Sequence, residues 1–214
     1  MLIHPWDAVR DDGEWRDWLS RRDFGELAVN GLPGEPPWVQ PMHFRYDGEH
    51  GPFGRVIAHL ARPNPLWDAL DTDPVVLLSV VGDVAFVPGP WAAPEGAPAE
   101  HGTPTSFYTA VQLCCTAHVV DDPVEKAELL NLQVARFQPG GGTAPVVPGE
   151  GPFARLLPGL RVLRLDVTEV RAKFKYAHHK PRAVQDRIVE GLAGRRAPGD
   201  HAAREHQLRR RTTP

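Results

Sequence analysis

The sequence predicts a mainly β fold of the α+β class, an antiparallel barrel or sandwich with helices packed outside it. Three observations predict this class. Several short segments alternate apolar and polar side chains, most strongly over residues 160–170. Gly82 and Asp83 separate two such segments in the manner of a tight hairpin turn. Helical periodicity is confined to a few stretches, and no glycine-rich phosphate loop leads from a strand into a helix.

The first half of the chain is expected to contain one helix and most of the strands. The helix begins after Asp11 or Asp12 and has Trp15, Trp18 and Leu19 on one face. The strands follow over residues 25–30, 37–46 with an interruption at Pro41, 54–60, 75–81, 84–87 and 107–120.

The clearest helix is Pro123–Phe137. Asp122 can cap its first turn, Pro123 suits the first helical position, and Glu125 completes a capping-box spacing. A long loop over residues 138–151, a strand over 160–170 and a short helix over 183–192 come next. The apolar face of the clearest helix is formed by Ala127, Leu130, Val134 and Phe137.

Length and composition describe an ordinary globular protein. The 214 residues, 42% of them hydrophobic, are enough for one well-packed domain, which we expect over residues 1–194, followed by a basic tail over 195–214. The net charge of −3 argues against broad nucleic-acid binding, so we interpret the tail as solvated rather than as a DNA-binding arm.

The expected location is cytoplasmic. No apolar run reaches the length of a membrane span, and the first residues contain no apolar signal core. Cys114 and Cys115 are adjacent, so on a strand they point to opposite faces and are poor candidates for a disulfide. Two free thiols fit a reducing compartment.

The segment AHLARPNPLW, residues 58–67, concentrates residues that can bind a cofactor. Pro63 and Pro65 stop a strand from continuing, so His59 and Arg62 lie close to a strand end on a stiff loop. A histidine and a cation there suit a cofactor with a metal or an anionic tail. The alternative is a core histidine beside a solvated arginine.

A second candidate is the cationic segment RAKFKYAHHK, residues 171–180. Arg171, Lys173 and Lys175 alternate, so an extended chain places them on one face, where they can grip phosphates or carboxylates. The alternative is a solvated face of an edge strand. His178 and His179 are adjacent and would diverge on a strand, so we interpret them as part of a polar loop rather than as joint metal ligands.

These segments resemble a known family in an ordered series. AHLARPNPLW resembles the GHLARANPQW-like segment of the PaiB-type FMN-binding negative transcriptional regulators. Residues 84–94, 103–112 and 173–181 resemble further motifs of that family, in the same order. The resemblance implies a split antiparallel β-barrel of the pyridoxamine-phosphate-oxidase-like kind, a homodimer, and a cofactor at the subunit interface.

Three segments depart from the family pattern. Residues 38–41 read WVQP instead of SHLP, residues 177–180 read AHHK instead of SQNR, and Ser106 and Phe107 replace a tryptophan and an asparagine. Polar side chains that bind flavin in the family are missing at these positions. PTSFYTAVQ, FQPGGG after the helix, and RAKFKY are instead similar to a haem-dependent subgroup on the same fold, the piperazate synthases.

The subgroup implies haem b as the cofactor, with FMN as the alternative, and a small hydroxylated amino acid as the substrate. The reaction is a lyase-type cyclisation of N(delta)-hydroxy-L-ornithine to L-piperazic acid, with N–N bond formation and loss of water. A flavin-binding transcriptional regulator and a flavin oxidoreductase are the alternative functions. No membrane or nucleic-acid partner is expected.

The site residues follow from the matched motifs. His59 is the expected axial ligand of the haem iron, since neutral imidazole is a common ligand. Lys175, Tyr108 and Ser106 are the expected catalytic residues, which handle substrate charge and the proton for the leaving oxygen. The other expected cofactor-binding residues are Arg62, Asn64, Trp67, Trp91 and Lys173.

Overall fold

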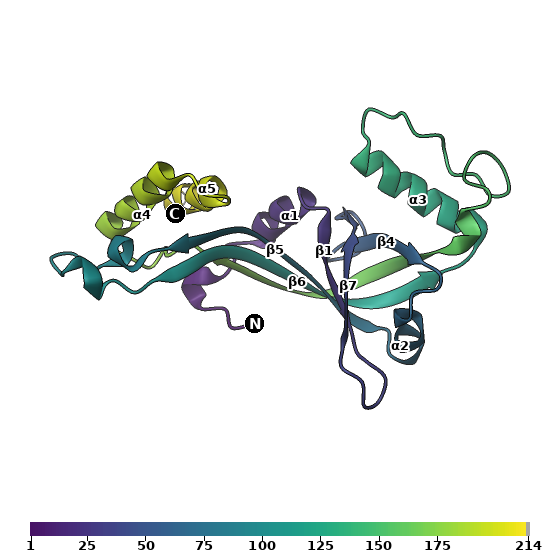
Figure 1. Cartoon of the computed structure of the whole chain (residues 1–214), viewed down its shortest axis with the longest axis horizontal. Coiled ribbons are helices and arrows are strands. Elements are labelled where there is room, and N and C mark those ends of the chain that lie inside the picture. The colour runs from purple at the N-terminus through teal and green to yellow at the C-terminus, as the bar shows by residue number, and fades with distance from the viewer. Residues whose placement is uncertain (213–214) are drawn as a thin grey trace. The chain divides into compact units, whose positions relative to one another are not determined.

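The computed structural model describes residues 1–212, and the side chains of residues 1–211. It contains a seven-stranded sheet with the strand order β2-β1-β5-β6-β7-β4-β3, in which the registered neighbours are antiparallel (Figure 1). The strands are β1 (Phe24–Val29), β2 (Trp38–His43), β3 (Arg45–Asp47), β4 (Arg55–Ala61), β5 (Val75–Val87), β6 (Thr105–Val120) and β7 (Leu160–Lys175).

Five α-helices and four short 3-10 turns accompany the sheet within the described residues. The helices are α1 (Asp12–Ser20), α2 (Leu66–Thr72), α3 (Pro123–Phe137), α4 (Arg182–Arg195) and α5 (Asp200–Thr212). The 3-10 turns are η1 (Pro5–Asp7), η2 (Gly89–Ala92), η3 (Ala99–His101) and η4 (Leu157–Gly159). No helix in this part of the chain is long and apolar enough to span a membrane.

The chain forms two compact units whose segments alternate along the sequence. The first unit contains residues 1–15, 81–111 and 171–214, and the second contains residues 16–80 and 112–170. Each of the long strands β5, β6 and β7 contributes residues to both units. The functional residues are therefore described unit by unit.

The structure confirms the two helices whose first residues the sequence predicted from capping residues. Helix α1 begins at Asp12, and Trp15, Trp18 and Leu19 are each at most 1% exposed. Helix α3 begins at Pro123, where the side chain of Asp122 accepts hydrogen bonds from the backbone N–H groups of Val124 and Glu125. These bonds satisfy donors that the first helical turn leaves free.

The predicted hairpin at Gly82 and Asp83 is wrong. Strand β5 runs unbroken from Val75 to Val87, and Asp83 adopts a φ of 54° within it. The dipeptide thus supplies the positive φ that a hairpin turn needs, but the chain does not reverse. Asp83 is held by His206, whose Nε2 atom lies 2.7 Å from Oδ2 of Asp83.

Proline also behaves differently from the prediction in one strand. Pro41 lies inside β2, paired with Glu26 of β1, and the chain leaves the strand only at Phe44. This is possible because β2 is an edge strand, where a missing N–H donor breaks no ladder bond on the outer side.

The expectation of a solvated basic tail is wrong for residues 200–212, which form α5. Ala203, His206, Gln207 and Arg210 of this helix are at most 8% exposed. Helices α4 and α5 pack against each other (Figure 1). Thr213 and Pro214 lie outside the described residues.

In the second unit, α3 packs on β4 and η4 around an apolar cluster. Lys126 crosses this cluster at 2% exposure, and its Nζ atom donates to the backbone oxygens of Leu157 (2.9 Å) and Leu160 (3.0 Å). The lysine fixes η4 to the helix, because a buried ammonium needs hydrogen-bond acceptors. The cluster comprises Ile57, Val120, Ala127, Leu130, Leu157 and Val162.

Candidate functional site

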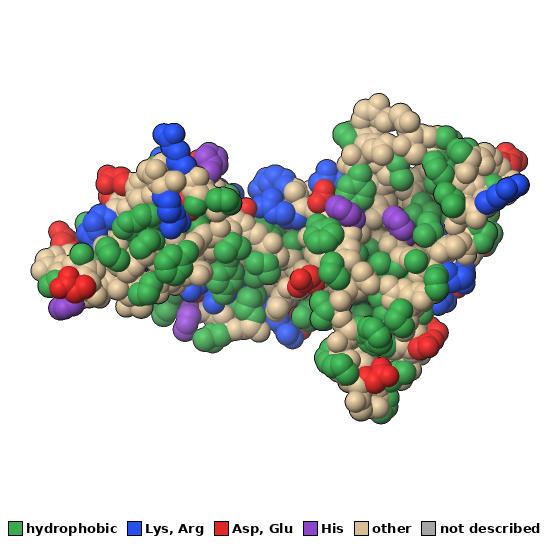
Figure 2. All heavy atoms as spheres, in the orientation of Figure 1, with side chains coloured by type: hydrophobic (Ala, Val, Ile, Leu, Met, Phe, Trp, Pro, Cys, Tyr) green, Lys and Arg blue, Asp and Glu red, His purple; other side chains and the backbone are tan. Residues whose placement is uncertain are grey.

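His59 lies on β4 with its side chain exposed, on a strand whose other residues are mainly buried. Its Nδ1 atom is 2.8 Å from Oε1 of Gln133, a residue of α3 that is only 2% exposed. A buried glutamine on the apolar face of a helix thus orients an exposed imidazole on the neighbouring strand. Figure 2 shows histidine and hydrophobic side chains together at the surface below α3.

A second hydrogen bond determines the tautomer of His59. The Nε2 amide of Gln133 donates to the backbone oxygen of His43 (3.2 Å), which fixes Oε1 as the atom that faces His59. An amide oxygen only accepts, so in the neutral imidazole form of His59 the proton is on Nδ1 and the lone pair is on Nε2. A metal-binding histidine has this arrangement, with one ring nitrogen held by an outer acceptor and the other available to a metal.

Aromatic rings lie close to the residues that hold His59. The ring of His43 contacts Phe24 at 4.9 Å and Phe137 at 5.2 Å between centroids, both edge-to-face. Phe24 is 51% exposed, and Leu132 of α3 is 46% exposed. The second unit therefore has aromatic rings packed on His43, the residue whose backbone oxygen holds Gln133, and some of its apolar side chains are exposed.

The other predicted residues on this segment have structural partners. Arg62 donates to Oδ1 of Asp121 (2.8 Å) and to the backbone oxygen of Pro158 (2.8 Å). The side chain of Asn64 donates to Gln40 and accepts from the backbone of Leu66 at the start of α2. Trp67 is 4% exposed, and its indole N–H donates to the backbone oxygen of Ala61. Their roles in cofactor binding stay predictions.

The remaining predicted residues belong to the first unit, so the predicted site falls into two groups. Lys173 and Lys175 lie near the ring of Tyr108, with Nζ atoms 5.6 and 5.7 Å from its centroid. Ser106 is half-buried on β6. Trp91 lies on η2, 5.0 Å from the guanidinium carbon of Arg195.

The two lysines are not equivalent, although they alternate as predicted. Lys173 is 7% exposed, and its Nζ atom donates to the backbone oxygen of Leu2 (2.9 Å) and lies 3.8 Å from Oδ2 of Asp7. Lys175 is half-buried, donates to Oγ1 of Thr105 (2.8 Å) and lines a cavity. Lys173 thus anchors the N-terminal segment, and Lys175 is the one that a ligand in the cavity can reach.

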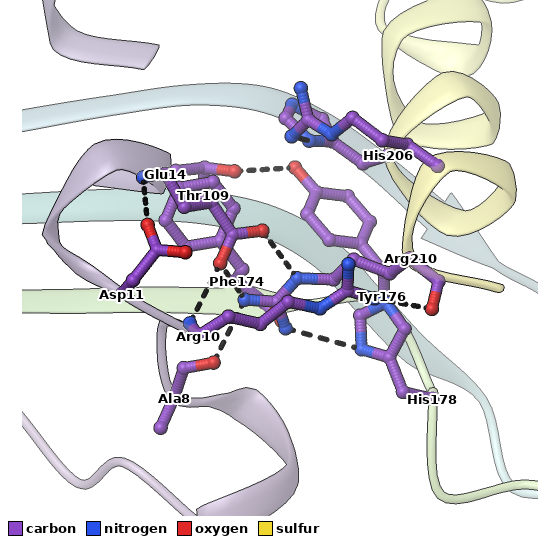
Figure 3. Close-up of polar contacts among 11 residues, drawn as sticks. Ala8, Arg10, Asp11, Glu14, Thr109, Phe174, Tyr176, His178, His206 and Arg210 are labelled. Carbon is purple, nitrogen blue, oxygen red and sulfur yellow. Dashed lines mark hydrogen bonds and ion pairs between the residues drawn. The ribbon is translucent and has the colours of Figure 1, made fainter. Parts of the chain in front are cut away.

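A buried polar network supports the end of β7 in the first unit (Figure 3). Arg210 of α5 makes a bidentate ion pair with Glu14, with Nε–Oε1 at 2.6 Å and Nη2–Oε2 at 2.5 Å, and donates to the backbone oxygen of Ala8 (2.8 Å). Its guanidinium also lies over the ring of Phe174 at 5.0 Å. Bidentate geometry of this kind fixes orientation as well as adding energy.

Tyr176 and His206 extend the network. The Tyr176 ring stacks on His206 with centroids 4.7 Å apart, and its hydroxyl is 2.8 Å from Oγ1 of Thr109. Since α5 supplies both His206 and Arg210, this helix holds the strand end that carries Lys175.

Burial changes the ionisation of three groups. Burial and the charge of Arg210 lower the pKa of His178 to about 4, so this imidazole is neutral at pH 7. Burial alone would raise the pKa of Glu14, but Arg210 and Arg10 outweigh it and the pKa lies below its ordinary value. Burial raises the pKa of Cys115 to about 12, so its thiol stays protonated and unreactive.

A bare metal site is not among the candidates. No group of three or more His, Cys, Asp or Glu side chains in the described residues is placed to hold an ion. An iron at His59 would therefore need most of its ligands from a cofactor.

Sequence reasoning missed Gln133 and Asp7. The only signal for Gln133 is a polar residue on the apolar face of α3, next to positions that were assigned to the core. Asp7 is 2% exposed, and it lies in an N-terminal segment without periodicity. Neither position has a motif of its own.

The sequence over residues 1–169 matches a protein-family model described as "Putative FMN-binding domain". No curated protein matches the chain. The flavocytochrome Anf3 from Azotobacter vinelandii is similar in structure, with a TM-score of 0.61 and 22% identity over 79% of this chain and 70% of that chain.

Two further solved structures are similar. A FAD and heme binding protein from Mycobacterium smegmatis has a TM-score of 0.60 and 18% identity, covering 86% of this chain and 79% of that one. A protein described as a putative 5-nitroimidazole antibiotic resistance protein from Bacteroides thetaiotaomicron has a TM-score of 0.57 and 13% identity, covering 77% and 84%. The fold is the predicted pyridoxamine-phosphate-oxidase-like split barrel.

Proposed function

The chain belongs to the family of the putative FMN-binding domain, and on that premise we propose that it is a haem-dependent piperazate synthase. It would bind haem b through His59 and convert N(delta)-hydroxy-L-ornithine to L-piperazic acid. The family accounts for the fold and for a flat redox-type cofactor. The choice of haem over FMN rests on this chain's own residues.

The observation that carries the proposal is the hydrogen bond between His59 and Gln133. It leaves the lone pair of His59 Nε2 available and orients the ring through a buried partner. Flavin binding needs no such ligand, whereas haem iron does. The second unit thus fits a haem: His59 would hold the iron, and the rings of Phe24 and Phe137, which pack on His43, would offer apolar surface to the cofactor.

Two further points support haem. The regulators that this chain resembles bind flavin through polar groups that this chain lacks at residues 38–41, 106–107 and 177–180. In addition, a flavocytochrome and a FAD and heme binding protein share the fold, so the split barrel is compatible with haem as well as flavin.

The reaction balances without an external oxidant or reductant. The α-amino nitrogen attacks the δ-nitrogen, so the N–N bond forms as the N–O bond breaks; the attacking nitrogen gives up one proton, and the leaving oxygen takes up one and departs as water. When bound, the haem iron would supply a Lewis acid for the hydroxylamine oxygen. The chain must hold the two nitrogens close together, since orientation lowers the barrier substantially.

The first unit supplies the proposed catalytic residues. Lys175 would bind the substrate's carboxylate or donate a proton, and Tyr108 and Ser106 would assist with proton transfer. The support is that the Lys175 ammonium lines a cavity and lies near the ring of Tyr108. We further propose a homodimer, which sedimentation of the cofactor-loaded protein tests.

Reconstitution tests the function directly. The haem-loaded chain, given N(delta)-hydroxy-L-ornithine without NADH, flavin or reductant, is expected to release piperazic acid, as measured by chromatography of the products. His59→Ala should lose the Soret band while keeping its far-ultraviolet circular dichroism, because an exposed histidine contributes little to the core. His50→Ala, which replaces an exposed histidine between β3 and β4, is the matched control.

Two results would reject the proposal. Unchanged substrate with a fully haem-loaded protein would rule out the synthase reaction. A yellow protein with a flavin spectrum and no Soret band would favour the second candidate, an FMN-binding protein. The match to the FMN-binding family model is the observation that supports that candidate.

A further inference from the structure

A cavity of about 240 Å³ lies in the first unit, in a different unit from His59. Its wall is formed by the N-terminal segment around η1, the end of β7 with the turn after it, and the segment that enters β6. The volume suits a molecule of about the size of an amino acid. Its charged lining residues are Asp7, Lys175 and Lys180.

Asp7 is a buried carboxylate with incomplete pairing. The residue is 2% exposed, its Oδ2 atom is 3.8 Å from the Nζ atom of Lys173, and its Oδ1 atom has no hydrogen-bond partner among residues 1–212. A buried charge without hydrogen bonds is unfavourable. A cationic group of a ligand in this cavity would supply the missing donor.

The opposite charge lies on Lys175. Its ammonium has three N–H donors, and the hydrogen bond to Oγ1 of Thr105 uses one of them. Thr105 also lines the cavity, so an anionic ligand group can be bound by an ammonium and a hydroxyl together. Burial lowers the pKa of His179, so that residue adds no firm positive charge at pH 7.

Apolar side chains make up much of the rest of the wall, including Trp6, Phe107 and Ile188. The ring of Trp6 stacks on His4 at 4.7 Å and lies 4.9 Å from the ring of His179. The cavity thus combines one carboxylate, ammonium groups and an apolar wall. A ligand with one cationic group, one anionic group and a short aliphatic stem complements all three.

We propose that this cavity binds an α-amino acid as its zwitterion, with the carboxylate on Lys175 and Thr105 and the ammonium on Asp7. Asp7 is then the residue that distinguishes an amino acid from a simple carboxylate. The identity of the amino acid, N-hydroxylated ornithine, rests on the proposed function, whereas the ligand class rests on the charges of the cavity.

Calorimetric titration of the haem-loaded full chain tests the ligand class with three non-reactive probes. L-Ornithine has both charged ends, pentanoate lacks the amines, and 1,4-diaminobutane lacks the carboxylate. L-Ornithine is expected to bind at least about ten-fold more tightly than either of the others, because each charged end contributes a charge-assisted hydrogen bond.

Variants then test which residue binds each charged end of the ligand. Asp7→Asn should weaken L-ornithine about ten-fold or more and leave pentanoate unchanged, whereas Lys175→Met should weaken both. Glu95→Gln, an exposed carboxylate of the same unit, is the matched control. Circular dichroism checks folding. If Asp7→Asn does not fold because its contact with Lys173 is lost, Lys175→Met and the three probes still decide the question.

The proposal is overturned if L-ornithine does not bind, or if both variants bind it like the unaltered chain. These results are separable from a failure of the proposed function. L-Ornithine binding that depends on Asp7, without turnover of the hydroxylated substrate, leaves the cavity assignment intact and removes the synthase. Turnover that is unaffected by both variants removes the cavity assignment and the proposed catalytic role of Lys175, but leaves the synthase reaction itself standing.

Discussion

Oε1 of Gln133 lies 2.8 Å from Nδ1 of His59, although the two residues are 74 positions apart in the sequence. The glutamine side chain is in turn fixed by the backbone oxygen of His43. An outer partner of this kind orients a metal ligand without touching the metal. Gln133 is therefore a positioning residue in the proposed haem site.

Gln133→Leu should weaken haem binding by about ten-fold, because His59 loses the acceptor that fixes its tautomer. Gln133→Glu keeps an acceptor and should restore most of the affinity. Titration of the cofactor-free protein with haem, followed at the Soret band, measures this. Gln138→Leu, past the end of α3, should behave like the unaltered chain, and equal affinities for all variants would contradict the role of Gln133.

Arg210→Met should destabilise the protein by about 3–5 kcal/mol, because it leaves the buried Glu14 carboxylate without its bidentate partner. Urea unfolding at pH 7 gives the free energy. Replacing both residues, Glu14→Leu with Arg210→Met, should recover part of this loss. Arg196→Met, an exposed arginine, should change stability by no more than about 0.5 kcal/mol. Only a small decrease in the free energy of unfolding of Arg210→Met would show that the ion pair contributes little to stability.

Stability should fall as the pH is lowered from about 6.5 to 4, in part because of His178. Its pKa is lowered to about 4 in the folded protein, from an ordinary value of 6.5, so the unfolded chain binds a proton in this window that the folded chain does not. The contribution is present in full above pH 6.5. After allowance for the partial exposure of His178, this contribution to the free energy of unfolding is about 1–3 kcal/mol.

Thermal unfolding at several pH values tests this contribution. His178→Gln should flatten the slope between pH 6.5 and 4, whereas His201→Gln, an exposed histidine of α5, should leave it unchanged. An identical slope in His178→Gln and the unaltered chain would assign the pH dependence to other groups.

Asp122→Ala should lower the free energy of unfolding by about 1 kcal/mol, since it removes the acceptor for the N–H groups of Val124 and Glu125 at the start of α3. Asp122→Asn should cost much less, because asparagine caps helices equally well. The free energy of unfolding in urea measures both. Equal losses for the two variants would mean that the charge of Asp122, rather than its cap, is what matters.

Local signals predicted the elements that depend on neighbouring residues. Asp122 and Pro123 marked the start of α3, and alternation over residues 160–170 marked β7, because caps and pleats are determined within a few residues. The hairpin at Gly82 and Asp83 failed because a positive φ is necessary for such a turn but not sufficient. His206, from a helix far along the chain, holds Asp83 within a continuous strand.

The candidate site was predicted in part for a similar reason. His59 and Lys175 lie in segments with recognisable patterns. Gln133 and Asp7 acquire their significance from partners that are distant in sequence, His59 and Lys173. Helix α5 was missed because its basic composition resembles a solvated tail, whereas Arg210 is buried against the carboxylate of Glu14.

The alternation of the two units along the chain has a consequence for synthesis on the ribosome. The second unit has all its residues once residue 170 has been made, but the first unit still needs residues 171–214. Glu14 is translated 196 residues before Arg210. At about 5–20 residues per second, the newborn N-terminal segment spends on the order of 10–40 s without that partner. The segment around Glu14 is thus synthesised well before the residues that complete its native contacts.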